Sequence, residues 1–177
     1  FVLHAARKLG ISGVTQALYD PEVSTLCHKL GVGAEITTEV GGKADTMHGA
    51  PFSITGKITS LTDGKYEDPK PSHGGFRFYY GGPSAAIETE DGFKILLITI
   101  PNGSFSLEQF RSAGIDPVKE KIMVVKGVHS PRTAYEPIAA EMTWLSTAGV
   151  TTSDLSNFTY KHRRSPLYPF EPETQWK

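Results

Sequence analysis

The residues best suited to chemistry are three basic side chains, Lys126, His129 and Arg132, which fall within seven positions of one another. They follow the apolar run 122–125, which predicts a buried strand, and they precede a helix-like segment. Cations at the carboxyl end of a strand, beside the free N–H groups of a helix start, would bind an anionic or carbonyl group. We therefore interpret these three residues as candidate catalytic residues. A solvated basic turn is the alternative, because charge clusters often mark plain surface.

A second group of candidates lies at the exit of another predicted strand. It consists of Gly41, Gly42, Lys43, Asp45 and His48, which we expect to bind substrate. Carboxylate and imidazole donors suit zinc or manganese, but a zinc site needs three or four protein ligands. We therefore expect no metal to be held by this chain alone, and we expect a glycine-shaped loop at the edge of a cleft.

No complete catalytic set accompanies these candidates. The sequence has no Gly-x-Ser-x-Gly elbow, phosphate loop, paired-cysteine motif or His-Glu-x-x-His helix. Cations and glycines at strand ends suit gripping a substrate carboxylate or carbonyl beside a metal or base that comes from elsewhere.

Composition bounds the class of protein. The chain has 177 residues, 38% hydrophobic and 21% charged, which fits one globular domain over residues 1–177. A net charge of -1 predicts neither nucleic acid nor a membrane surface as a partner. A single cysteine excludes an internal disulfide framework, and no apolar run approaches the ~20 residues of a membrane span. We expect a cytoplasmic protein.

The periodicity of the chain predicts an α/β (α+β) domain. Alternation with period two predicts a mixed, mostly antiparallel sheet with strands at 34–40, 52–58, 76–80, 85–89 and 93–100. About four helices flank this sheet, at 1–9, 21–30, 106–113 and 134–142, although Pro137 should kink the last one or delay its start.

Local signals sharpen two of these helices. Asp20, as N-cap before a proline, opens the second helix, whose residues Val23, Leu26, Cys27 and Leu30 form one apolar face. Cys27 is therefore expected to be a packed thiol rather than a nucleophile. In the third helix, Ser106 and Gln109 predict a capping box.

The two ends of the chain differ from its middle. Residues 1–9 read as a helix without an initiator methionine, so we expect an upstream part that holds some of the chemistry. Residues 150–177 are basic and proline-rich, which predicts an extended arm that lies on the domain or reaches for a partner.

We expect the histidines outside the two candidate groups to be surface residues; these are His4, His28, His73 and His162.

Many short motifs occur in an order and at spacings typical of one family. They are found at 18–22, 31–34, 41–43 with Asp45 and His48, 110–111, 114–117, 124–126, 137–140 and 160–169. On these motifs the chain resembles, over nearly its whole length, the carboxyl-terminal domain of the microcystinase C (MlrC) family of zinc metallopeptidases.

The resemblance implies a division of labour between two domains. Family proteins are much longer and are thought to hydrolyse peptide-like amides with zinc bound by an amino-terminal domain. This chain would then be the substrate-side domain, its partner the N-terminal metal-binding domain, its substrate a small peptide-like molecule, and its zinc ligands residues outside the chain. Two alternatives remain: a non-catalytic module for a small anionic ligand, and glycine loops that shape the interface of a homo-oligomer.

One departure from the family pattern concerns the basic turn. The family has Lys-Ser and then His-Phe-Arg, whereas here Gly127 follows Lys126, and two residues separate His129 from Arg132. The lysine-to-arginine spacing is kept but the histidine is shifted by one. We therefore expect a subfamily whose substrate need not be a cyanobacterial toxin.

Overall fold

The structure is a computed structural model that describes residues 1–71, 74–149 and 154–175. His73, one of the predicted surface histidines, lies outside these residues. The chain divides into two compact units, Phe1–Trp144 and Leu145–Lys177, and each is described by itself.

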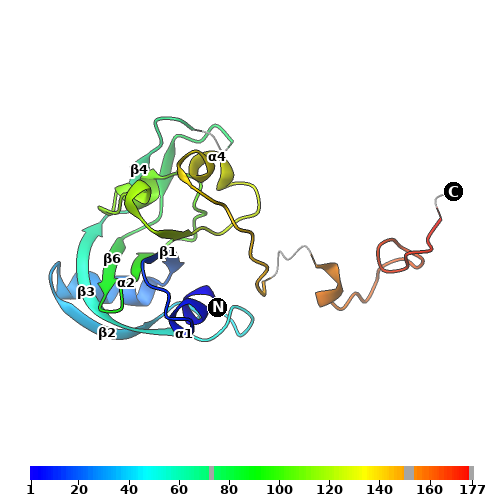
Figure 1. Cartoon of the computed structure of the whole chain (residues 1–177), viewed down its shortest axis with the longest axis horizontal. Coiled ribbons are helices and arrows are strands. Elements are labelled where there is room, and N and C mark those ends of the chain that lie inside the picture. Colours follow the sequence, from blue (N-terminus) through cyan, green and yellow to red (C-terminus); the bar gives the residue numbers. More distant parts are fainter. Residues whose placement is uncertain (72–73, 150–153, 176–177) are drawn as a thin grey trace. The chain divides into compact units, whose positions relative to one another are not determined.

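The first unit is built on a six-stranded sheet (Figure 1). Its strands, in spatial order, are β2 (Glu35–Val40), β3 (Phe52–Thr62), β6 (Ser84–Thr89), β7 (Lys94–Ile98), β1 (Val14–Tyr19) and β8 (Ile122–Val124). Pairing is antiparallel from β2 to β7 and parallel between β7 and β1 and between β1 and β8. A separate antiparallel ribbon joins β4 (Lys65–Glu67) and β5 (Phe78–Tyr80). The predicted mixed, mostly antiparallel sheet is confirmed.

The described residues contain four α-helices, as predicted: α1 (Val2–Lys8), α2 (Pro21–Leu30), α3 (Glu108–Arg111) and α4 (Arg132–Tyr135). Single 3-10 turns occur at Pro117–Lys119, Glu136–Ile138 and Leu155–Asn157. The predicted helix over 134–142 is wrong in its extent. Only one α-turn forms before Pro137, and the backbone is extended again at Ala139, because proline lacks the N–H that would continue the helical ladder.

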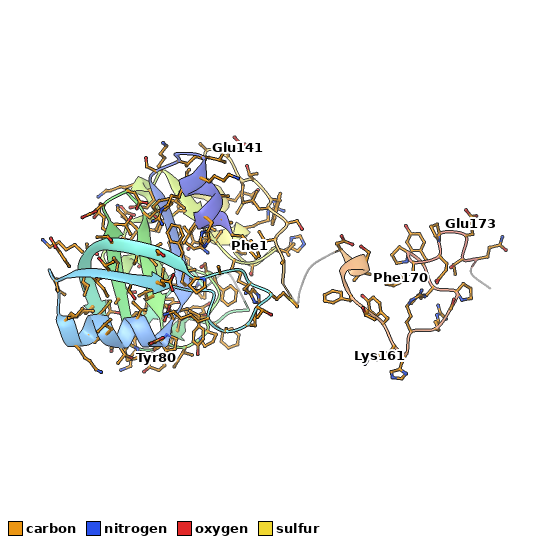
Figure 2. All side chains as sticks on the ribbon, turned by 90° about the horizontal axis from the view of Figure 1, so that it is seen from below. Phe1, Tyr80, Glu141, Lys161, Phe170 and Glu173 are labelled. Atoms are coloured by element: carbon orange, nitrogen blue, oxygen red, sulfur yellow. The ribbon has the colours of Figure 1, made fainter. Side chains whose placement is uncertain are left out.

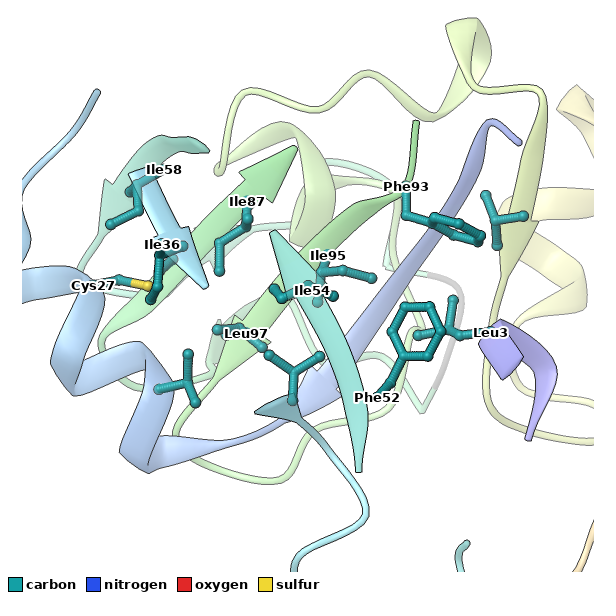
Figure 3. Packing of buried hydrophobic residues seen from close by; sticks show 14 of the residues in the cluster. Leu3, Cys27, Ile36, Phe52, Ile54, Ile58, Ile87, Phe93, Ile95 and Leu97 are labelled. Carbon is teal, nitrogen blue, oxygen red and sulfur yellow. The ribbon is translucent and has the colours of Figure 1, made fainter. Parts of the chain in front are cut away.

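The larger core cluster is formed by residues of α1, α2 and the sheet. Along β3, buried and exposed residues alternate over 52–58, which is the signature of a strand with one face on a core. Phe52 packs edge-on against Phe93 with 5.6 Å between ring centroids, near Leu3, while Cys27 lies beside Ile36 (Figure 3). The prediction of a packed Cys27 is confirmed, since its side chain is 0% exposed.

Two local predictions about helices need correction. Leu26 and Leu30 are 39% and 47% exposed, so the apolar face of α2 is narrower than its spacing suggested. The capping box does not form. Ser106 Oγ accepts a hydrogen bond from the Glu108 N–H, while the side-chain amide of Gln109 is buried without a hydrogen-bond partner.

The second unit is held by contacts among its own residues. The guanidinium of Arg163 donates two hydrogen bonds, of 2.9 and 2.6 Å, to the carboxylate of Glu171, which also accepts from the Leu167 N–H at 2.7 Å. Tyr160 packs edge-on against Phe170, with ring centroids 4.9 Å apart. Figure 2 shows Lys161, Phe170 and Glu173 in this unit.

Candidate functional site

The glycine loop, residues 41–51, is anchored at the carboxyl end of β1. Asp20 follows β1 directly and begins α2 as its N-cap, with Oδ1 accepting from the Val23 N–H at 3.1 Å. Oδ2 accepts from the Gly41 N–H at 2.9 Å, a contact between residues 21 positions apart. One buried carboxylate therefore binds both the start of α2 and Gly41, the first residue of the glycine loop, which we call its root.

Lys43 lies between two carboxylates. Its Nζ is 3.1 Å from Oδ2 of Asp20 and 3.4 Å from Oε2 of Glu22. The side chain of Asp20 is 1% exposed, that of Lys43 33% and that of Glu22 81%. The positive charge of Lys43 is thus balanced within the protein by Asp20 and Glu22.

Asp45 organises the tip of the glycine loop. One oxygen, Oδ1, accepts from the backbone N–H groups of Met47 and His48 at 2.8 and 2.9 Å, and Oδ2 lies 2.6 Å from Nδ1 of His48. The hydrogen bond from the His48 N–H, followed by that from its imidazole, lowers the pKa of Asp45 below its ordinary value. Asp45 and His48 are therefore brought together, as a carboxylate that orients an imidazole.

The two ends of the glycine loop approach each other at Gly42, Ala50 and Pro51, which we call the neck of the loop. Its φ is +61°, and a Cβ there would lie 2.6 Å from the carbonyl carbon of Ala50 and 2.7 Å from the nitrogen of Pro51. Glycine is required at this position both by the left-handed backbone and by the close approach of the returning chain. The loop is closed at its root, neck and tip.

The basic turn, which carries Lys126, His129 and Arg132, follows β8. This strand runs parallel to β1, with Val124 opposite Gln16, so the chain leaves both strands at one edge of the sheet. Asp20 follows β1 directly, and Lys126 comes two residues after β8. Lys126, His129 and Arg132 are all exposed. The topology therefore brings the basic turn to the same edge of the sheet as Asp20, to which the glycine loop is bonded.

Arg132 and His129 border a shallow surface hollow of about 570 Å³, together with Thr133, Glu136 and Pro137. The guanidinium of Arg132 donates to Oε1 of Glu136 at 2.8 Å, which raises the pKa of Arg132 and lowers that of Glu136. The ring of His129 packs edge-on against Trp144, with centroids 6.2 Å apart. The hollow thus offers an imidazole and a paired guanidinium to solvent.

Two expectations about this turn are wrong. The apolar run 122–125 contains the edge strand β8, whose three residues are only partly buried because β8 has β1 as its single neighbour. The helix that follows, α4, has four residues, too few to supply the aligned N–H groups of a helix N-terminus as an anion site.

Lys126 differs from the other predicted cations. Lys43 is paired with Asp20, and Arg132 with Glu136. Within the described ranges, no hydrogen bond or ion pair involves Lys126, and none links the basic turn to the glycine loop. Lys126 is consequently a predicted cation whose charge no side chain among the described residues balances.

The side chains that the structure describes do not form a metal site. The described residues contain no group of three or more histidine, cysteine, aspartate or glutamate side chains that could hold an ion. Asp45 and His48 offer two donors, one fewer than a zinc site needs from protein. Any metal chemistry would need ligands from outside the described residues.

The sequence of this chain matches a known protein family. A family model described as the MlrC C-terminus matches residues 1–162. The chain belongs to the MlrC C-terminal family. Microcystinase C of Sphingomonas sp. is 27% identical to it over 156 residues, which are 88% of this chain and 29% of that protein. The chain therefore spans less than a third of the length of this MlrC relative.

A solved structure shares the fold of this MlrC C-terminal domain. The crystal structure of a "putative metallopeptidase" from Mesorhizobium sp. BNC1 aligns with a TM-score of 0.82 and 21% identity, over 99% of this chain and 35% of the other.

No helix among the described residues is long and apolar enough to cross a membrane.

The role of Asp20 went unrecognised in the sequence. The Asp-Pro pair identified it correctly as a helix N-cap, and Oδ1 has that role. The bond from Oδ2 to Gly41 depends on how the glycine loop folds back, which local sequence does not encode. The available signal was a carboxylate directly after a predicted strand, where α/β sheets carry their ligand sites.

Proposed function

We propose that this chain is the substrate-side domain of an MlrC-like, zinc-dependent amidohydrolase that acts on peptide-like amides. The zinc and its activated water belong to an N-terminal metal-binding domain, and this chain completes the cleft. The observation that carries the proposal is that the parallel strands β1 and β8 end at the same edge of the sheet. There β1 leads into Asp20, which is bonded to the first residue of the glycine loop, and β8 leads into the basic turn. Family membership and the length of the MlrC relatives support it.

Within that cleft the residues of this chain bind and orient the substrate. Lys126 donates to a substrate carboxylate or carbonyl, and Arg132 and His129 line the surface hollow. A charge-assisted hydrogen bond to a developing oxyanion is among the largest single contributions to catalysis. The glycine loop presents Lys43 and an imidazole of fixed orientation, His48, at the cleft edge.

Comparing the full-length gene product with the 177-residue chain tests this function. The full-length protein should retain about one zinc per chain after dialysis and hydrolyse small peptide-like amides, because a catalytic zinc takes three protein ligands. The isolated chain should lose its metal to chelator and show no hydrolysis. A full-length protein that binds no divalent metal, or a chain that keeps stoichiometric zinc, would contradict the proposal.

A second candidate function is a non-catalytic module for a small anionic ligand. The exposed ammonium of Lys126, which has no partner among the described residues, favours it. Tight carboxylate binding by a full-length protein that hydrolyses no amide would select this alternative. A third reading, a homo-oligomer whose interface is shaped by the glycine loops, predicts instead that Lys126→Ala changes mass in solution and leaves ligand binding intact.

A further inference from the structure

Asp20 makes more bonds than a helix cap requires. An N-cap needs one oxygen that accepts from the first turn, and Oδ1 of Asp20 accepts from Val23 at 3.1 Å. The second oxygen serves the glycine loop, with the Gly41 N–H at 2.9 Å and the ammonium of Lys43 at 3.1 Å.

The chain offers a comparison in Asp116, which also precedes a proline. Asp116 caps a 3-10 turn through a 3.3 Å bond from the Val118 N–H. Its remaining ion pairs are with Arg111 and Lys119, which lie within five positions on the surface. Capping alone therefore accounts for a local carboxylate, and it does not account for the long-range contacts of Asp20.

The burial of Asp20 points the same way. Its side chain is 1% exposed, and a carboxylate taken out of water is costly unless charge and hydrogen bonds compensate it. A well-packed apolar group is often as stabilising as a buried ion pair, so the pair is better explained by the position it imposes. What Asp20 fixes is the root of the loop and the direction of Lys43.

We propose that Asp20 is a positioning residue that holds the glycine loop against β1 and directs the Lys43 ammonium into the cleft. An ammonium has three donors. Asp20 takes one, Glu22 takes a second at 3.4 Å, and the third is left for a substrate carbonyl or carboxylate. Because Glu22 is 81% exposed, it can release Lys43 when a ligand arrives, while the buried Asp20 keeps its hold. The nature of this ligand rests on the proposed function.

The first test measures the loop in the 177-residue chain. Asp20→Asn retains a good N-cap but removes the charge and one acceptor, and Asp116→Asn makes the same chemical change away from the loop. Hydrogen exchange at the Gly41 amide should become about tenfold faster or more in Asp20→Asn and remain unchanged in Asp116→Asn. Equal protection of Gly41 in all three proteins would overturn the proposal.

The second test is a double-mutant cycle in the full-length protein. Asp20→Asn and Lys43→Ala should each raise KM about tenfold with a smaller effect on kcat, and the double variant should resemble Lys43→Ala alone. Effects that multiply would show that Asp20 does not act through Lys43. Should the full-length protein hydrolyse no amide, the proposed function fails, while exchange at Gly41 still decides whether Asp20 holds the loop.

Discussion

The imidazole of His48 is held by the carboxylate of Asp45, with Nδ1 2.6 Å from Oδ2 and 2.8 Å from Oδ1. An ionised carboxylate can only accept hydrogen bonds, so Nδ1 carries the proton in the neutral imidazole. The lone pair of Nε2 is then left to face solvent or substrate. His4 and His28 have the opposite arrangement, since their Nε2 atoms lie 3.2 and 3.1 Å from backbone carbonyl oxygens.

These contacts predict different tautomers within one chain. At pH 8, long-range ¹H–¹⁵N spectra should show neutral His48 protonated on Nδ1, and His4 and His28 protonated on Nε2. Asp45→Asn should give His48 a mixture of tautomers and leave the other two unchanged. Protonation of wild-type His48 on Nε2 would be incompatible with the Asp45 contact.

The neck of the glycine loop predicts a stability difference between two glycines of similar φ. Gly42→Ala should lower the free energy of unfolding by about 3 kcal/mol, because its Cβ would meet the backbone of Ala50 and Pro51. Gly10→Ala is the matched control, with φ +67° and no atom within 4 Å of the added Cβ, and should cost about 1 kcal/mol. Urea unfolding of both variants measures the difference, and equal losses would mean that the neck is not tight.

Cys27 predicts how stability changes at alkaline pH. Burial, aided by the negative charge of Asp20, raises the pKa of its thiol from the ordinary 9.0 to about 11. Between pH 9 and 11 the folded state therefore binds more protons than the unfolded state. The stabilisation that the thiol gives to the folded state is complete below pH 9 and is lost as the pH rises towards 11. At pH 10 the loss is about 1.4 kcal/mol.

The Cys27→Ala variant isolates this contribution. Its free energy of unfolding should lie closer to that of the wild type at pH 10 than at pH 8, since the alanine protein has no thiol to ionise. A stability difference that stays constant over this range would show that the thiol titrates normally in the folded protein.

Variants of Arg132 test whether the surface hollow binds substrate. In the full-length protein, Arg132→Ala should lower kcat/KM about a hundredfold, and Arg132→Lys should recover little, because lysine lacks the planar fork of a guanidinium. Arg111→Ala is the control, since Arg111 forms a similar surface pair with Glu108 at 2.8 Å and lies outside the hollow. Similar rates for the Arg111 and Arg132 variants would remove Arg132 from the site.

Local sequence predicted the elements of this fold better than their environments. Alternation over 52–58 predicted β3, and Asp20 with Pro21 predicted the start of α2, since both signals arise from neighbouring residues. The apolar run 122–125 predicted a buried strand but forms an edge strand, because burial depends on which strands lie beside it.

The parts of the candidate site that the sequence predicted are those whose contacts are local in the chain. The motif from Gly41 to His48 predicted a glycine-shaped loop, and the Asp45–His48 contact is local to it. The pairing of Lys43 with Asp20, and of Arg132 with Glu136, changes which cations can meet an anion. The first of these contacts spans 23 positions and depends on the folded chain.

The central claim is that the turn after β8 binds substrate, and Lys126 tests it most directly because its charge has no partner among the described residues. In the full-length protein, Lys126→Ala should lower kcat/KM for a peptide-like amide about a hundredfold, since one lost charge-assisted donor costs about 3 kcal/mol. Lys119→Ala, which removes a lysine side chain that is 80% exposed, should leave the rate unchanged. Rates for Lys126→Ala within about twofold of the wild type, with unchanged melting temperature, would reduce the turn to a surface feature and contradict the account.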